Sequence, residues 1–391
     1  MLKERYLTRY VHEDVMEKMV FVGGPRQVGK TTLAKHVAGL YFKNFQYLNW
    51  DEQQDRRDMK AGRLPTDKKL IIFDEIHKYK NWKNFLKGIY DKHKDRYKIL
   101  VTGSARLDVY RKGGDSLLGR YHYYRLHPFT IAEFINKFNV PKVLKEIDFY
   151  SSKETKEALD ILLKFGGFPE PLLKQNEKAL RRWHNERTEL LVREDIRDLQ
   201  NIRDISSLET LVDILPSKVG SLLSLNSLRE DVEVAHKTIA LWMNVLERFY
   251  YHFRIFPFYH NKIRALKKES KLYLWDWSQV NSEAALFENI VASHLLKFCH
   301  FLKDNLGYRA ELWYLRDVDG REVDFFVSIK DQPWFAVEVK SSFQKPAHNL
   351  LYFGRKIKIP FLYQTTFEEN VDVMENSVRI ISVDKFLSGL I

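Results

Sequence analysis

The first 130 residues alternate between short apolar runs and segments with helical spacing. Two of the runs, residues 19–22 and 70–73, are wholly apolar, which is typical of strands buried on both faces of a parallel sheet. Further strand-like runs follow, and segments with helical spacing separate them. This alternation predicts a doubly wound parallel α/β sheet. The predicted strands cover residues 19–22, 45–50, 70–73, 99–102 and 121–126, and the predicted helices cover 1–18, 32–38 and 82–93.

The pattern changes after residue 150. Residues 151–215 are charged and helical, with a break at Gly166-Gly167, which indicates a helical lid or connector. Three short helical segments and an aromatic strand-like run then predict a winged helix-turn-helix. Those segments cover residues 217–223, 226–231, 234–249 and 250–256. The predicted domains are an N-terminal α/β domain (1–150), the connector (151–215), the winged helix-turn-helix (216–268) and a C-terminal α/β domain (269–391).

A glycine loop at residues 24–31 follows the first predicted strand and fits G-x-x-x-x-G-K-[ST]. Gly24 and Gly29 allow a tight turn in which successive N–H groups point at a polyphosphate, and the next helix adds its N-terminal partial charge. Lys30 would reach the β- and γ-phosphates, and the Thr31 hydroxyl would hold Mg²⁺. An ordinary glycine-rich turn is the alternative. The predicted nucleotide-binding residues are Gly24, Pro25, Gln27, Val28, Gly29, Lys30, Thr31 and Thr32.

Two carboxylates, Asp74 and Glu75, end the apolar run 70–73, at the edge where α/β sheets bind ligands. Asp74 would support the Mg²⁺ shell, and Glu75 would orient or deprotonate the attacking water. Paired with the glycine loop, they predict a P-loop fold that binds ATP with Mg²⁺ and hydrolyses it.

A small polar residue after the next strand is expected to sense the γ-phosphate or the attacking water. Ser104 is the first choice for this sensor and Thr102 is the second. A helix N-cap at Ser104 is an equally weighted alternative, and it does not exclude the sensor role.

The composition favours a soluble globular protein with a polyanionic partner. Lysine and arginine number 64 against 52 acids, which gives a net charge of +12 and a pI near 9.3. This balance favours DNA, although basic enzymes without such a partner are common. The charged N-terminus has no signal-peptide core, no apolar run approaches a membrane span, and the single cysteine, Cys299, excludes an internal disulfide. A cytoplasmic protein with no membrane partner is expected.

Basic side chains in the predicted winged helix are candidates for contacts with DNA phosphates. A winged helix used only for protein packing is an equally weighted alternative. The candidate DNA-binding residues are His236, Lys237, Lys262, Arg264, Lys267 and Lys268.

The C-terminal domain carries a second constellation on two predicted strands, 322–327 and 335–340. Because strand side chains repeat every two residues, Glu338 and Lys340 share a face, and Asp324 is expected to join them. Asp324 and Glu338 offer oxygen ligands to Mg²⁺ or Mn²⁺, Glu288 from a helix at 284–301 would complete the metal shell, and Lys340 would stabilise developing charge.

This spacing resembles the PD-(D/E)XK nuclease superfamily, which implies metal-dependent cleavage of phosphodiesters. A chance acidic hairpin is one alternative. A nuclease-like fold that binds DNA without cutting it is the other.

Over almost its whole length, the chain resembles the archaeal and bacterial AAA+-type ATPases whose C-terminal half carries a winged helix and a restriction-endonuclease-like domain. The resemblance implies that Arg120 is an arginine finger or sensor, acting in its own or a neighbouring subunit of a homo-oligomer. A surface or structural arginine is the alternative. The stretches that carry the resemblance are residues 24–33, Asp74-Glu75, Thr102-Gly103-Ser104, Leu118-Gly119-Arg120 and 128–134, where Glu133 is the expected capping-box partner of Thr130.

Three functions fit these patterns. The first is an Mg²⁺-dependent ATPase coupled to DNA binding, with metal-dependent DNA cleavage by the C-terminal domain. The second is a nucleotide-switched DNA-binding regulator that never cuts DNA. The third, an ATPase that acts on protein partners, requires the basic charge to be incidental.

Overall fold

The computed structural model describes residues 4–65, 67–103, 117–138, 140–196, 204–258 and 269–391. The chain divides into two compact units. The first unit comprises Met1–His127 with Arg248–Tyr250, and the second comprises Pro128–Glu247 with Tyr251–Ile391. The predicted divisions at residues 150, 215 and 268 remain predictions.

Five strands of the first unit form a wholly parallel sheet in the order β2-β3-β4-β1-β5. The predicted parallel α/β sheet is therefore confirmed. Each predicted strand begins and ends within one residue of the observed strand. The observed bounds are β1 Met19–Gly23, β2 Phe45–Asn49, β3 Leu70–Asp74, β4 Lys98–Thr102 and β5 Tyr121–Arg125.

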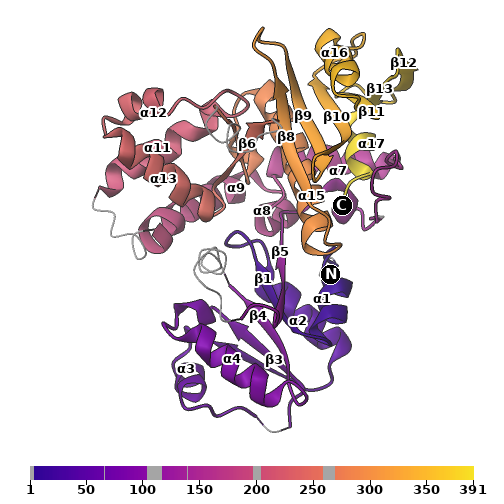
Figure 1. Cartoon of the computed structure of the whole chain (residues 1–391). Helices are drawn as coiled ribbons and strands as arrows, with labels where there is room; N and C mark the ends of the chain where they lie inside the picture. Colours follow the sequence, from indigo (N-terminus) through magenta and orange to yellow (C-terminus); the bar gives the residue numbers. More distant parts are fainter. Residues whose placement is uncertain (1–3, 66, 104–116, 139, 197–203, 259–268) are drawn as a thin grey trace. The chain divides into compact units, whose positions relative to one another are not determined.

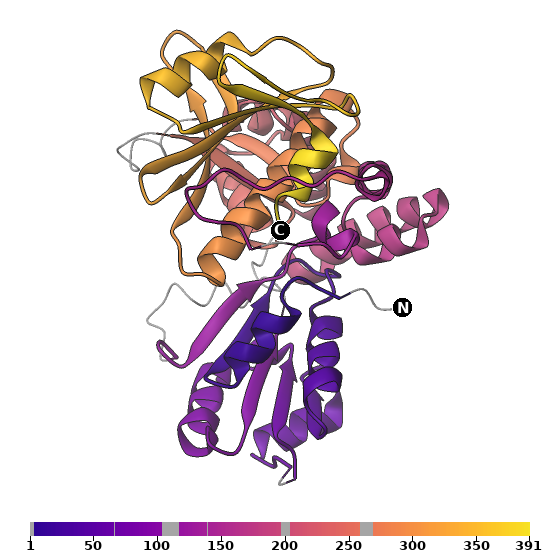
Figure 2. The same cartoon turned by 90° about the vertical axis from the view of Figure 1, so that its right-hand side faces the viewer.

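Helices cover both faces of this sheet (Figures 1 and 2). One face packs against the first two helices, and the other packs against the next two. On the latter face, Trp82 and Leu86 form a buried core with Phe21 and Phe73 of the sheet. Burial on both faces explains why β1 and β3 have no alternating pattern. The helices are α1 Thr8–Val15, α2 Lys30–Tyr41, α3 Gln53–Lys60 and α4 Trp82–His93.

The register of the sheet brings polar residues to its carboxyl edge. Asp74 at the end of β3 pairs in register with Asn49 of β2 and with Thr102 of β4. Thr102 in turn lies level with Val22 of β1, one residue before Gly23 and the glycine loop. The phosphate loop and the acids therefore meet at one edge of the sheet.

The second unit begins with helices and contains a second sheet. Gly166, at φ +71°, ends α7 at the break predicted from sequence, and Pro169 begins α8. The helices of this unit are α6 Ile131–Phe134, α7 Lys153–Phe165, α8 Pro169–Lys174, α9 Glu177–Glu189, α11 Ile205–Ile214, α12 Leu225–Val232, α13 His236–Arg248, α15 Glu283–Asp304, α16 His348–Lys356 and α17 Val383–Ser388.

Eight strands form the second sheet, in the order β12-β13-β11-β10-β9-β8-β6-β7. Phe335 of β10 contacts Phe298 of α15, and its neighbour Ala336 packs with Leu350 of α16. Since adjacent side chains of a strand point to opposite faces, α15 and α16 cover opposite faces of this sheet. The strands are β6 His252–Pro257, β7 Lys271–Leu274, β8 Ala310–Arg316, β9 Glu322–Ile329, β10 Gln332–Lys340, β11 Phe361–Thr366, β12 Asp372–Glu375 and β13 Val378–Ser382.

The helix predicted at residues 217–223 is wrong. A short 3₁₀ turn, Leu215–Lys218, occupies its start, and Val219 and Leu222 then bridge to β7. Gly220, at φ +75°, turns the chain between these two bridges. The predicted strand at 250–256 exists as β6, but it pairs with β7 and β8 and so belongs to the large sheet. The winged helix remains a prediction.

The predicted capping box between Thr130 and Glu133 is also wrong. The Thr130 side chain makes no capping hydrogen bond and donates to the Ile391 carbonyl oxygen instead. Glu133 accepts from Lys297 of α15 at 2.6 Å, and both side chains are fully buried. A buried carboxylate needs a charged partner, and this need overrides the weaker local cap.

The structure bears on two expectations from the sequence, one about membrane-spanning helices and one about the single cysteine. Among the residues that the structure describes, no helix is long and apolar enough to cross a membrane. Cys299, the single cysteine of the chain, is buried in α15.

Candidate functional site

The glycine loop has the backbone conformation of an anion-binding turn. Gly24 has φ +141°, and a Cβ on it would lie 2.5 Å from the Leu126 carbonyl oxygen, so only glycine fits. Gln27 and Gly29 have φ +62° and +95°, and α2 begins at Lys30 immediately after Gly29. Successive N–H groups and a helix N-terminus therefore converge in the loop, where they can bind a phosphate group.

Lys30 places an ammonium group within the loop. Its Nζ donates to the carbonyl oxygens of Gly24 and Pro25 at 3.1 and 2.7 Å, and the residue is only 8% exposed. These contacts hold a positive charge beside the converging N–H groups. The combination fits the polyphosphate of a nucleotide.

The Asp74 carboxylate lies at the centre of a polar cluster. It accepts from the hydroxyls of Thr31 at 2.8 Å, Tyr47 at 2.7 Å and Thr102 at 2.6 Å. Thr31 and Asp74 thus meet as predicted, and their oxygens are the ligand type that Mg²⁺ prefers. Tyr47 was missed by sequence reasoning, although its place in the strand next to β3 was a usable signal.

Glu75 lies directly beside this cluster in a strained backbone conformation. Its φ of +53° is left-handed, which costs a non-glycine residue about 1 kcal/mol and is typical of functional sites. Its Oε2 atom lies 3.4 Å from Nε2 of His77 and 3.8 Å from Nζ of Lys78. Burial raises the pKa of the Glu75 carboxyl, while Lys30 and Lys78 act in the opposite direction.

Replacing Lys78 by methionine is expected to shift the acid limb of ATP hydrolysis to higher pH. Glu75 is the predicted general base and would act deprotonated, so the rate is expected to fall as pH drops through its raised pKa. Loss of the Lys78 charge raises this pKa further. The measurement is kcat/KM against pH, with the exposed neighbour Lys80→Met as the control. An acid limb that does not move in Lys78→Met contradicts the assignment of Glu75 as the base.

The two remaining predicted residues of this site differ in what the structure says of them. Arg120 makes a two-point ion pair with Asp91 of α4, with Nε–Oδ1 and Nη2–Oδ2 distances of 2.7 and 3.1 Å. This pairing is a structural role within one chain, and the finger or sensor role stays a prediction. Ser104 lies outside the described residues. Its second choice, Thr102, is bonded to Asp74.

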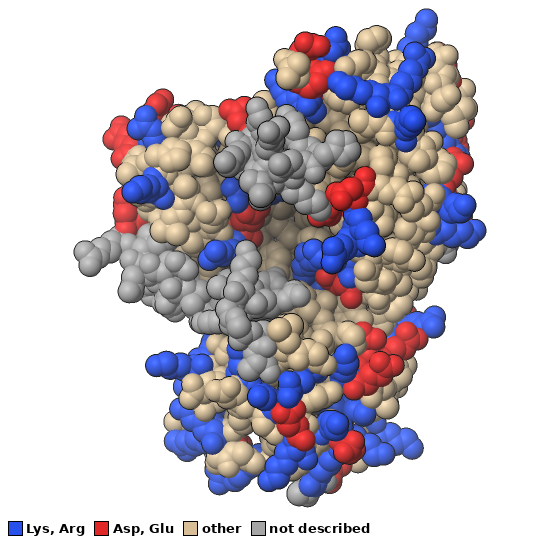
Figure 3. Space-filling view, in the orientation of Figure 1, with Lys and Arg blue, Asp and Glu red and all other residues tan. Residues whose placement is uncertain are grey.

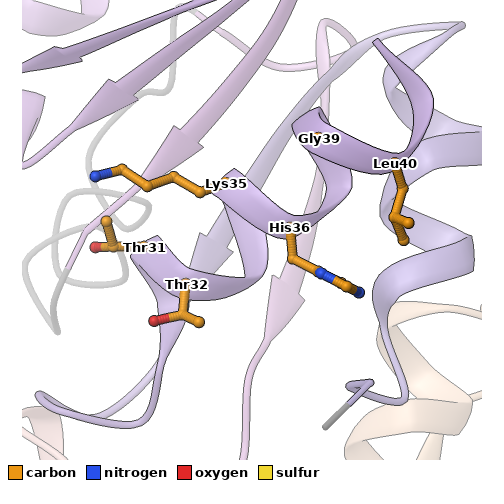
Figure 4. Close-up of a pocket in the computed structure, with 6 residues that line it drawn as sticks. All are labelled: Thr31, Thr32, Lys35, His36, Gly39 and Leu40. Atoms are coloured by element: carbon orange, nitrogen blue, oxygen red, sulfur yellow. The ribbon is translucent and has the colours of Figure 1, made fainter. Parts of the chain in front are cut away.

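A hollow of about 440 Å³ runs along α2 from the end of the glycine loop (Figure 4). Its walls are two neighbouring rows of residues spaced by four along the helix. Lys35 from one row lies with Nζ 3.8 Å from the centre of the Tyr47 ring. Thr31, at the loop end of the hollow, is also the residue that donates to Asp74. The lining residues are Thr31, Thr32, Lys35, His36, Gly39 and Leu40.

The structure also brings together the predicted polar residues of the second unit. Asp324 of β9 accepts from the backbone N–H of Val339, the residue between Glu338 and Lys340. Lys340 donates to Glu338 at 2.8 Å. Asp324, Glu338, Lys340 and Glu288 thus form one electrostatic cluster, as the strand alternation predicts.

Lys271 and Glu322 belong to the same cluster and were missed by sequence reasoning. The Lys271 ammonium lies 2.7 Å from Glu322, 3.1 Å from Glu288 and 3.4 Å from Asp324. Burial alone would lower the pKa of Lys271, but these three carboxylates reverse the effect and raise it. Burial and the Asp324 charge raise the pKa of Glu288 and Glu338 to about 7.

The carboxylate cluster does not fit the metal that its residue types suggest. In the described part of the chain, no group of three or more histidine, cysteine, aspartate or glutamate side chains is arranged to hold a metal ion. Most of the carboxylate contacts go to Lys271, Lys340 and backbone. One exception is Oε2 of Glu338, which is buried and has no hydrogen-bond partner among the described residues.

The predicted DNA-binding residues are only partly described. His236 and Lys237 are exposed at the start of α13, while Lys262, Arg264, Lys267 and Lys268 lie outside the described residues. On the face drawn in Figure 3, the described basic side chains of each unit are interspersed with acids rather than gathered in one stripe. DNA contact therefore remains a prediction.

Three family models match successive parts of the chain. Residues 16–135 match an AAA domain. Residues 156–289 and 283–386 match two domains of unknown function, DUF8612 and DUF4143. The AAA match, the parallel sheet and the glycine loop agree, so the first unit carries an AAA-type P-loop domain.

Two relatives that are similar over most of this chain carry the description uncharacterized protein. One, MJ1544 of Methanocaldococcus jannaschii, is 25% identical over 94% of this chain and 87% of its own length. Another, from Haemophilus influenzae, is 22% identical over 91% of each chain.

Among solved structures, the Thermotoga maritima RuvB Holliday junction branch migration motor aligns with 64% of this chain and 88% of its own, at 18% identity and a TM-score of 0.29. Bacteroides Pif1 bound to single-stranded DNA aligns with 35% of this chain and 45% of its own, at 17% identity and a TM-score of 0.25. TM-scores of this size establish no shared overall fold.

Proposed function

We propose that this protein is an Mg²⁺-dependent ATPase whose nucleotide state is coupled to DNA binding. The observation that carries the proposal is the 2.8 Å hydrogen bond from the Thr31 hydroxyl to Asp74, at the edge of the sheet where Lys30 and Glu75 also lie. A hydroxyl and a carboxylate next to a phosphate loop fit nucleotide and Mg²⁺ together.

Each residue of the site has a separate role in this proposal. Lys30 and the loop N–H groups bind the β- and γ-phosphates, and Thr31 with Asp74 holds the Mg²⁺, which would offset phosphate charge when bound. Glu75 orients or deprotonates the attacking water. Ser104 or Thr102 senses the γ-phosphate, and Arg120 is the finger or sensor, in its own subunit or in a neighbouring subunit of a homo-oligomer.

DNA is the proposed macromolecular partner because of charge. The net charge of +12 favours a polyanion, and His236 and Lys237 present an exposed basic start of α13. Lys262, Arg264, Lys267 and Lys268 complete the proposed contact set.

A second candidate function is a nucleotide-switched DNA-binding regulator without nuclease activity. The position of Lys271 among Glu288, Glu322 and Asp324 favours it, because an ammonium group already neutralises these carboxylates. Mg²⁺- or Mn²⁺-dependent cleavage by Asp324, Glu338 and Lys340 would require the carboxylates to bind metal instead.

ATP hydrolysis measured with and without DNA tests the coupling. The proposal expects an Mg²⁺-dependent rate that changes when DNA is added and DNA affinity that differs between the ATP-bound and nucleotide-free protein. If DNA does not change the rate of ATP hydrolysis and ATP does not change the affinity for DNA, an ATPase that acts on protein partners is favoured instead. The same samples, incubated with labelled DNA and Mn²⁺ or Mg²⁺, report any cleavage.

Replacing Lys237, Lys267 and Lys268 together by alanine is expected to weaken DNA binding about equally for all sequences. Each lost phosphate contact should also reduce the slope of log affinity against log salt by about 0.9 for double-stranded DNA. The measurement is binding of labelled duplexes over a range of salt concentrations.

A matched triple variant controls for the loss of charge alone. Lys142, Lys153 and Lys330 are exposed lysines of the second unit outside the proposed contact set. Their replacement by alanine removes the same charge from other positions. Equal salt slopes in the two triple variants would move the DNA contact away from the predicted winged helix.

A further inference from the structure

The Lys271 side chain occupies the carboxylate cluster of the second unit as a fixed group. Its side chain is 4% exposed, and the Nζ atom lies within 3.4 Å of Glu288, Glu322 and Asp324. An ammonium group has three N–H donors, and three carboxylates surround it here. Lys271 therefore supplies the positive charge and the N–H donors that these carboxylates would otherwise need from a metal ion.

The backbone on either side of Lys271 is held in place. Lys271 pairs with Ile255 of β6 and bridges to Leu222, and Leu223 donates its N–H to the Ser270 carbonyl at 2.8 Å. The segment before Leu222 also approaches the acids, because a Cβ on Gly220 would lie 3.0 Å from Oε2 of Glu288. Lys271 thus belongs to a paired strand, so its ammonium group is not that of a mobile surface lysine.

Most of the remaining oxygen atoms of the cluster have other contacts. Asp324 gives one oxygen to Lys271 and the other to the Val339 N–H at 2.9 Å. Glu288 accepts from both Tyr273 and Lys271 at its Oε1 atom, and Glu322 also pairs with Arg316 at 2.6 Å. Oε2 of Glu338 is buried, and no described residue forms a hydrogen bond with it. Besides Oε2 of Glu288 and Oε2 of Glu338, each carboxylate oxygen of the cluster already accepts from a protein donor, so a divalent ion would compete with these donors for its ligands.

We propose that the Lys271 ammonium is the resident cation of the cluster formed by Glu288, Glu322, Asp324 and Glu338, and that it excludes divalent metal ions from these carboxylates. A divalent ion bound to Glu288 and Asp324 would lie next to the positive charge of Lys271. Because little water surrounds the buried cluster, the two positive charges would repel each other strongly. Metal binding therefore requires the ammonium to leave. The inference deepens the second candidate function, and it is independent of ATP hydrolysis and DNA binding.

Mn²⁺ binding to the full-length protein without nucleotide tests the proposal. The free Mn²⁺ is followed by electron paramagnetic resonance during titration of the wild type and of Lys271→Met, which keeps the length of the side chain and removes its charge. Lys271→Met is expected to gain one Mn²⁺ site, at least about tenfold tighter than any site of the wild type. Adding Asp324→Asn to Lys271→Met should abolish the gained site.

The exposed lysine Lys330, in the turn between β9 and β10, provides the matched control. Lys330→Met loses the same charge and is expected to behave as the wild type. Thermal unfolding checks that each variant is folded. If Lys271→Met does not fold, Lys271→Gln, which keeps hydrogen-bond donors without charge, takes its place in the same comparison.

Two results would overturn the proposal. One is a wild-type Mn²⁺ site that Asp324→Asn removes, since the carboxylates would then bind metal with Lys271 present. The other is a folded, uncharged Lys271 variant with no gain in Mn²⁺ binding, since the ammonium would then not be what excludes the metal.

Discussion

Replacing Lys30 by alanine is expected to lower ATP turnover at least about 100-fold and to abolish tight ATP binding. Lys30 is 8% exposed and holds its ammonium among the carbonyl oxygens of Gly24 and Pro25, where the loop N–H groups also converge. Alanine removes the charge that would neutralise the β- and γ-phosphates. Gly24 and Gly29 keep the positive φ angles that turn the backbone of the loop.

The measurements for this variant are the steady-state rate of ATP hydrolysis and the affinity for ATP by calorimetry. Lys43→Ala, an exposed lysine just beyond α2, is the matched control and should keep the wild-type values. A Lys30→Ala protein that hydrolyses ATP at the wild-type rate would contradict the assignment of the loop as the phosphate site.

Replacing Glu75 by glutamine is expected to lower kcat about 100- to 10,000-fold while the protein still binds ATP. Glutamine has nearly the same size and keeps the contacts at Nε2 of His77, but it cannot take a proton. Because burial raises the pKa of the Glu75 carboxyl, the wild-type rate should fall at acid pH. The residual rate of Glu75→Gln should lose this acid limb.

Single-turnover kinetics separate the two steps for Glu75→Gln, since binding and hydrolysis are then measured apart. Glu17→Gln, at an exposed position between α1 and β1, makes the same chemical change outside the site. Were the Glu75→Gln protein to turn over ATP at the wild-type rate, another group would have to position the water.

The parallel sheet and its phosphate site could be predicted because their signals are local. Residues 70–73 are apolar without interruption, and burial on both faces of a parallel sheet is what such a run indicates. The register then places Asp74 level with Thr102 and near Thr31. Motif spacing and sheet topology agree here, so the prediction extends to individual side chains.

The errors and omissions arose where a distant residue decides the local structure. Glu133 follows Thr130 at capping-box spacing, but its partner is Lys297, which lies 164 residues away. The apolar residues of 217–223 have helical spacing, yet Val219 and Leu222 bridge to β7. Lys271 begins a short strand that β8 and β6 separate from β9 in the sheet order, so nothing in its neighbourhood pointed to Asp324.

The first unit contains three residues, Arg248–Tyr250, whose neighbours on both sides belong to the second unit. The Tyr250 hydroxyl lies 3.4 Å from the Tyr123 hydroxyl, and a Cβ on Gly23 would lie 1.8 Å from that same Tyr123 oxygen. Tyr250 and Tyr123 are therefore buried neighbours, and Tyr123 in turn lies against Gly23, the last residue of β1 before the phosphate loop.

This insertion makes the first unit impossible to isolate by a single cut. A fragment that ends at His127 would lack Arg248–Tyr250. It would therefore lose the Tyr250 hydroxyl that lies 3.4 Å from the Tyr123 hydroxyl. The chain passes directly from α13, most of which belongs to the second unit, into Phe249 and Tyr250 of the first unit.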